Sequence, residues 1–191
     1  GQGLETCFSQ IAAETLGVAL EAVRVVTDDT ACVPYGIGTM GSRSLVVGDS
    51  AVLQACEAVL ADARRVAAHR LATREDALRF ESGSFFHGDD PGRRLGLREI
   101  AHCVYSGIGL PPGLQPCLEA TRVFDPPNFT SSFGCHLCVV EVDCETGVVA
   151  IRRYVAVDDC GRAINPALVE GQIHGGIAQG IGQALLEEAV Y

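Results

Sequence analysis

The chain has 191 residues, 48% of them hydrophobic, and a formal net charge of −10, which suits one ordinary domain or two small lobes. Its basic residues are scattered and no apolar run reaches the roughly 18 residues of a membrane span, so neither nucleic acid nor a membrane is an expected partner. No basic n-region opens the chain, and nine cysteines, an odd number, favour reduced, buried thiols in a cytoplasmic protein.

The first part of the chain predicts two helices with a strand and a glycine-rich loop between them. Apolar residues recur at helical spacing over residues 5–16, and Gly17 ends that helix. Residues 21–27 contain three valines and predict a short strand. The glycine-rich stretch 33–44 follows, and a long helix with an apolar stripe then runs to about Leu71.

The middle of the chain is less regular than its two ends. Proline pairs mark turns over residues 73–127, which we expect to be an irregular connector with one short helix at 97–105. Alternating apolar residues then predict a hairpin with strands at 137–143 and 148–157.

One more helix is expected at the end of the chain. Asn165 is a typical cap and Pro166 a typical first-turn residue, so this helix should run to about Val190. The mixture of helices and a hairpin predicts an α+β fold, with two possible lobes at residues 1–72 and 128–191.

The loop at residues 36–44 has the composition of an anion-binding site. Three glycines, a threonine and two serines stand directly before the long helix, where free backbone N–H groups and the helix dipole favour negative charge. The loop lacks the lysine of a P-loop, and no apolar strand leads into its G-x-G-x-x-G spacing. A surface loop that only caps the helix explains the same residues equally well.

The last predicted helix contains five glycines, each of which costs about 1 kcal/mol relative to alanine. Gln172, Gly176, Gln179 and Gln183 fall on one stripe of that helix. A bare, amide-bearing stripe suits a polar heterocycle, because amides donate and accept in fixed directions. A packed helix crossing explains the glycines but not the three amides, which need partners when buried. We therefore favour a bound ligand, rather than a second helix packed on the glycines, as the explanation of this helix. These glycines are Gly171, Gly175, Gly176 and Gly180.

Two further motifs are weaker. Gly1-Gln2-Gly3 stands directly before the first helix and could expose N–H groups to a ligand, although a plain turn is the simpler explanation. Cys135 and Cys138 form a C-x-x-C, but residues three apart on a strand point to opposite faces and no second pair exists. We expect no metal or redox role for this pair.

Taken in order, these segments resemble the large subunits of molybdenum hydroxylases, the family of xanthine dehydrogenase, aldehyde oxidase and aerobic carbon monoxide dehydrogenase. The opening Gly-Gln-Gly is similar to the family's GQG-x-x-T segment, and the glycine-rich loop is similar to its second cofactor loop. The likeness is most specific in the last helix and identifies the chain as a fragment of the cofactor-binding domain. The matching segments are 1–6, 33–44, 133–134, 139–143, 145–147, 157–161, 165–166 and 170–185.

The resemblance implies a molybdopterin cofactor, in bacteria usually the cytosine dinucleotide, that holds molybdenum. It implies a small-molecule substrate: hydroxylation of aldehydes or N-heterocycles with oxygen from water, or oxidation of carbon monoxide. Electrons would leave through 2Fe–2S clusters on an iron–sulfur small subunit and through FAD on a medium subunit, within a dimer of heterotrimers.

Motif matching also implies which residues contact the cofactor. The backbone of Gly41 falls where the family approaches the metal. The family's catalytic glutamate would follow Tyr191 and its substrate arginine would precede Gly1, so no catalytic residue is expected in the chain. We expect Gln172 to lie within about 20 Å of Gly41, the span of one dinucleotide-sized ligand. The matched residues are Gln2, Gly3, Gly41, Ser42, Ser44, Gln172 and Gln179.

Two residues depart from the family's motifs. Leu4 stands where many bacterial members carry histidine, and Cys7 replaces a commoner threonine or small residue. These differences affect individual cofactor contacts, but they do not affect the resemblance to the family. Two other functions stay open: a generic nucleotide- or anion-binding module that uses the loop before the long helix, and a folded structural fragment that binds nothing.

Overall fold

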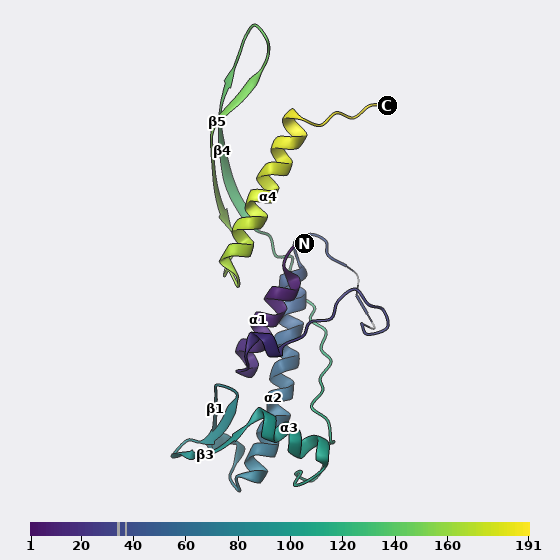
Figure 1. Ribbon diagram of the computed structural model, residues 1–191, viewed down its shortest axis with the longest axis vertical. Coiled ribbons are helices and arrows are strands. Elements are labelled where there is room, and N and C mark those ends of the chain that lie inside the picture. Colours follow the sequence, from purple (N-terminus) through teal and green to yellow (C-terminus); the bar gives the residue numbers. More distant parts are fainter. Residues whose placement is uncertain (34, 37) are drawn as a thin grey trace. The chain divides into compact units, whose positions relative to one another are not determined.

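The computed structural model describes residues 1–33, 35–36 and 38–191 (Figure 1). Helices and antiparallel strands are mixed along the chain, which confirms the α+β class. The elements are α1 (Leu4–Leu16), η1 (Leu20–Ala22), η2 (Leu45–Asp49), α2 (Ser50–Arg70), η3 (Glu75–Ala77), β1 (Leu78–Glu81), β2 (Ser84–His87), β3 (Asp90–Gly96), α3 (Leu97–Ser106), β4 (Phe133–Val142), β5 (Val149–Asp159) and α4 (Pro166–Leu185).

The chain forms two compact units. One is Gly3–Pro127, and the other combines Gly1–Gln2 with Asn128–Tyr191. The sequence predicts an irregular connector at 73–127 that follows a lobe at 1–72, but the structure groups both stretches in the first unit. Within the described part of the chain, no helix is long and apolar enough to cross a membrane.

Helices α1 and α2 pack against each other in the first unit (Figure 1). Helix α1 ends where Gly17 takes a left-handed φ of 62°, and the Val18 N–H donates to the Ala13 carbonyl at 3.0 Å. Both predicted helices of this region are confirmed, although the second begins as a single π-helical turn, η2. A Cβ atom at Gly48 in that turn would lie 2.6 Å from the Phe8 ring, so only glycine permits this packing.

The strand predicted at residues 21–27 is wrong. The short 3-10 helix η1 begins at Leu20, and the residues after it belong to no strand. Val23 has the extended backbone that valine favours, with φ −96° and ψ 126°. No neighbouring strand among the described residues pairs with this segment, and propensity without a partner does not make a strand.

The predicted connector instead contains a three-stranded antiparallel sheet in the order β1-β2-β3. Strands β1 and β2 have four residues each, too few to show a clear alternation in the sequence. Phe85 of β2 is 0% exposed at the centre of a core shared with α2 and α3. The short helix predicted at 97–105 is confirmed as α3. The buried core residues are Ala63, Val66, Ala67, Ala68, Leu78, Phe85, Ile100, Cys103 and Val104.

Strands β4 and β5 form the predicted hairpin in the second unit. Their pairing runs from Phe133↔Asp159 to Val142↔Val149, with a register shift after Val139. Both strands extend further at the open end of the hairpin than the alternating apolar pattern predicts, because β4 begins at Phe133 and β5 ends at Asp159. Many of its apolar side chains are exposed, Phe133 to 73%.

Helix α4 follows the hairpin and is capped as predicted. The Asn165 Oδ1 accepts a hydrogen bond from the Leu168 N–H at 3.1 Å, and proline follows at the first helical position. The helix ends at Leu185 and not near Val190. It runs beside the hairpin (Figure 1), and Ile181 on α4 lines a groove with side chains of both strands.

The nine cysteines are all free thiols. The expected burial applies to Cys7, Cys56 and Cys103, whereas five others are exposed. Cys135 and Cys138 both lie on β4, and only Cys138 lines the groove beside α4.

Candidate cofactor-binding site

The glycine-rich loop has the unusual backbone that its sequence predicts. Gly38, Gly41 and Ser42 have left-handed φ values of 81°, 61° and 56°. Ser42 is not a glycine, so this conformation costs about 1 kcal/mol or more. The Ser44 hydroxyl donates to the Thr39 hydroxyl at 2.8 Å and ties the two ends of the turn together. Pro34 and Ile37 of this loop lie outside the described residues.

This loop is open to a ligand. A Cβ atom at Gly38 or Gly41 would meet nothing within 4 Å. Among the described residues, the backbone N–H groups of Gly41 and Ser42 have no hydrogen-bond partner, and η2 begins shortly after them, at Leu45. Unpaired N–H groups beside a helix N-terminus stabilise an anion or a polar ring edge.

Gln2 and Gly3 lie at the start of α1. Gly3 is the N-cap residue, with a left-handed φ of 80° and no side-chain cap, and its carbonyl accepts from the Cys7 N–H at 3.1 Å. The Gln2 side chain is exposed. The amide of Gln2 can therefore turn towards a ligand at little cost.

Helix α4 has two different sides. Ile173 and Ile177, like Ile181 in the groove, are half-buried, whereas the glutamine stripe is exposed. The packed crossing considered from the sequence is not present within this unit, because a Cβ atom at Gly171, Gly175, Gly176 or Gly180 would meet nothing within 4 Å, although Gly180 also lines the groove beside the hairpin. A flat ligand could thus approach the backbone of α4 directly. The exposed amides are Gln172, Gln179 and Gln183, and the open glycines are Gly171, Gly175, Gly176 and Gly180.

Asp49 is a buried carboxyl that the sequence does not reveal. It is 5% exposed, and neither of its oxygens has a hydrogen-bond partner among the described residues. Burial raises its pKa from 3.8 to about 6. Burial, and secondarily the Asp49 charge, also raises the pKa of the Cys7 thiol. The only sequence signal is a single acid among the apolar residues that open the long helix.

A polar cluster on the hairpin also escapes the sequence. The His136 ring lies between two β5 side chains, with Nδ1 3.1 Å from the Tyr154 hydroxyl and Nε2 3.3 Å from Asp158 Oδ1. The next residue, Asp159, turns away and accepts from the Gly161 N–H at 2.9 Å. Strand alternation puts His136, Tyr154 and Asp158 on one face, but their contact depends on the register.

The chain is similar to known proteins over essentially its whole length. A model of the molybdopterin cofactor-binding domain matches residues 1–191. The carbon monoxide dehydrogenase large chain of Hydrogenophaga pseudoflava is 44% identical over 97% of this chain and 23% of its own length. The structure of carbon monoxide dehydrogenase from Oligotropha carboxidovorans has a TM-score of 0.93 at 38% identity, over 100% of this chain and 24% of that one.

Quinoline 2-oxidoreductase from Pseudomonas putida 86 is also similar, with a TM-score of 0.90 at 38% identity over 100% of this chain and 24% of that one. The chain therefore spans about a quarter of the length of the relatives it matches. As the resemblance to molybdenum hydroxylase large subunits predicts, the chain belongs to the molybdopterin cofactor-binding domain family.

Proposed function

We propose that this chain holds the molybdenum cofactor of an oxidoreductase large subunit. The observation that carries the proposal is the exposed side of α4, where glycines leave the backbone bare beside Gln172 and Gln179. A helix seldom keeps so many glycines without a close neighbour, and no protein element of this unit fills that place. The donor set fits the group, because a pterin presents both donors and acceptors along its ring edges.

The matched residues have distinct roles in this proposal. The Gln172 and Gln179 amides donate to and accept from the cofactor's polar edges, whereas the amides and hydroxyls of Ser42 and Ser44 hold its anionic part. The backbone of Gly41 would approach the metal, as the family resemblance implies. When bound, the cofactor supplies the redox centre at which the substrate is oxidised. Gln2 and Gly3 complete the cofactor contacts that we propose.

The cofactor's form and the enzyme's partners extend the same proposal. A cytosine dinucleotide would bring phosphates to the unpaired N–H groups before η2, which suits their positive potential. We propose a cytoplasmic dimer of heterotrimers, in which an iron–sulfur subunit with 2Fe–2S clusters and an FAD subunit carry the electrons away. The relatives are named for carbon monoxide and for quinoline, so we propose carbon monoxide or an N-heterocycle as the substrate; an aldehyde is implied by the family resemblance alone.

A generic nucleotide- or anion-binding module is the second candidate. The unpaired N–H groups of Gly41 and Ser42 favour it, because they would accept any phosphate. It does not use the glutamine side of α4, whereas the cofactor proposal does. A structural fragment that binds nothing would use neither the N–H groups of the loop nor the glutamine side of α4.

The test is to express the full-length subunit with its partner subunits in a host that makes the cofactor. We expect bound molybdenum and released cytidine nucleotide in the purified enzyme. Gln172→Ala should lower both, whereas Gln115→Ala, an exposed glutamine of the other unit, should leave both unchanged. Folded enzyme with neither molybdenum nor cytidine would rule out the proposal, and nucleotide without molybdenum would favour the second candidate.

A further inference from the structure

The polar cluster on the hairpin is built around a missing side chain. A Cβ atom at Gly134 would lie 2.4 Å from Asp158 Oδ1 and 2.8 Å from the Val157 carbonyl oxygen. The Asp158 carboxylate therefore occupies the space that any other residue at 134 would fill. The same Oδ1 atom faces His136 Nε2 at 3.3 Å. We call Gly134, His136, Tyr154 and Asp158 the His136 clamp.

The hydrogen bonds of the clamp have a definite direction when the imidazole is neutral. A carboxylate only accepts, so the proton is on Nε2 and is donated to Asp158. Nδ1 then accepts from the Tyr154 hydroxyl, 3.1 Å away. The two rings meet edge-on, with an interplanar angle of 86°. His136 thus holds β5 at two points, on either side of Ala156.

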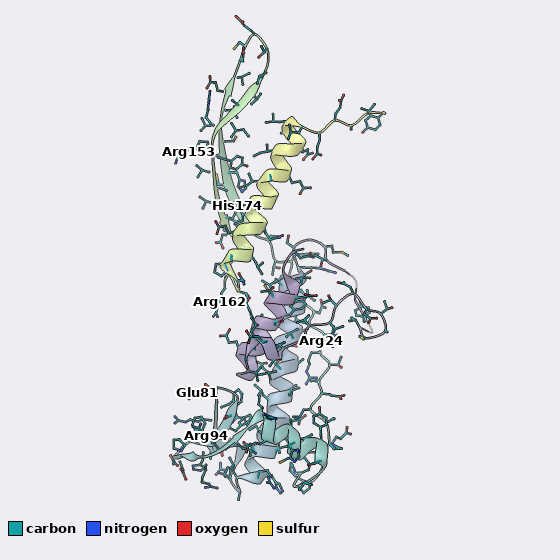
Figure 2. The ribbon with its side chains drawn as sticks, viewed as in Figure 1. Arg24, Glu81, Arg94, Arg153, Arg162 and His174 are labelled. Carbon is teal, nitrogen blue, oxygen red and sulfur yellow. The ribbon has the colours of Figure 1, made fainter. Side chains whose placement is uncertain are left out.

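Separate hydrogen bonds follow the clamp along the chain towards α4. The side chain of Asp159, directly after the clamp, accepts from the Gly161 N–H at 2.9 Å, where Gly161 is left-handed with φ 73°. Asn165 then accepts from the Leu168 N–H at 3.1 Å. Figure 2 labels Arg162 within this turn. Polar contacts therefore fix the chain at both ends of the turn between β5 and α4.

We propose that His136 is a positioning residue that sets where α4 begins and thereby directs Gln172 towards the cofactor. Gln172 lies six residues after Pro166, which is about 9 Å along the helix axis at 1.5 Å per residue. A small change in the direction of the helix start is therefore carried to the amide. The identity of the ligand in this inference rests on the proposed function, whereas the geometry of the clamp does not.

The hairpin itself does not need the clamp. Backbone pairing extends along both strands to Val142↔Val149, and the His136 side chain is 38% exposed, so its loss removes little buried area. A matched control lies on the same hairpin, where the Arg152 Nε donates to Glu141 Oε2 at 2.6 Å. That cross-strand pair is distant in sequence from the turn into α4.

The experiment compares four variants of the full-length enzyme with its partner subunits. His136→Ala removes the clamp, and Gly134→Ala presses a Cβ atom against the Asp158 carboxylate and the Val157 carbonyl while it keeps every polar group. His136→Gln offers a conservative rescue, and Glu141→Gln is the control. The readouts are molybdenum per protomer and hydrogen exchange of the backbone amides from residue 160 to Gln172.

We expect His136→Ala and Gly134→Ala each to lower molybdenum content severalfold and to speed exchange in the 160–172 segment. His136→Gln should recover part of both losses. Wild-type retention and exchange in His136→Ala would overturn the inference. A wild-type enzyme without molybdenum would refute the proposed function instead, and exchange would still test the clamp.

Discussion

Replacing Asp49 by asparagine should stabilise the protein at neutral pH. Asp49 is 5% exposed at the contact between η2 and α1, and no donor in the described part of the chain reaches its carboxylate. Burying an unpaired charge is unfavourable, and this is why its pKa rises from 3.8 to about 6. Asparagine has nearly the same shape and carries no charge.

The sign and size of the effect follow from that pKa. Below pH 3.8 the carboxyl is protonated in both the folded and the unfolded chain, so it costs nothing electrostatically. As the pH rises towards 6, the unfolded chain releases the proton first, and the free energy of unfolding falls. Above the folded pKa the penalty is complete. It amounts to at most about 3 kcal/mol, since each pKa unit corresponds to about 1.36 kcal/mol.

Urea denaturation of wild-type and Asp49→Asn chains at about pH 3 and about pH 8 measures this difference. We expect nearly equal stability at the lower pH and a gain of about 2–3 kcal/mol for the variant at the higher pH. Asp62→Asn is the control, because this exposed α2 carboxylate pairs with Arg65 at 3.3 Å and should change stability by less than about 1 kcal/mol. Equal effects of Asp49→Asn at both pH values, or a loss at the higher one, would show that Asp49 has a partner and refute the reasoning.

Three further predictions concern packing and helix ends. Gly17→Ala should cost about 2 kcal/mol or more in urea, because φ is 62° and the new Cβ would lie 2.2 Å from the Gly83 nitrogen. Phe85→Ala should cost about 3–5 kcal/mol, since the side chain is 0% exposed, whereas Phe129→Ala, at a fully exposed position, should cost almost nothing. Asn165→Ala should cost about 1 kcal/mol and reduce helical circular dichroism, because the cap of α4 is lost. Equal unfolding midpoints for the two phenylalanine variants, or an unchanged midpoint for either of the others, would contradict these assignments.

The parts of the fold that the sequence predicts are those set by local chemistry. Asn165 and Pro166 mark the start of α4 because capping depends on neighbouring residues alone. The exposed stripe that contains Gln172 is predictable because helical geometry fixes which residues share a side. The left-handed conformation of Gly41 follows in the same way from the glycine-rich loop.

The features that escape prediction depend on contacts between distant segments. Asp49 looks like an ordinary polar residue near a helix start until α1 covers it. His136 and Asp158 are 22 residues apart, and they meet only because of the strand register and the space left at Gly134. The sequence does not reveal the sheet β1–β3, because its first two strands are short, although one face supplies Phe85 to the core.

The glycine-rich composition of α4 has a consequence for the motion of the helix. With each glycine lowering local stability by about 1 kcal/mol and nothing packed on Gly175 or Gly176, the middle of this helix should open more often than the ends of the β4–β5 ladder. Its amides should exchange quickly in cofactor-free protein and slowly once a ligand covers that side. Such a helix could admit a large rigid cofactor late in folding, and the time course of amide protection would then follow the insertion of the cofactor.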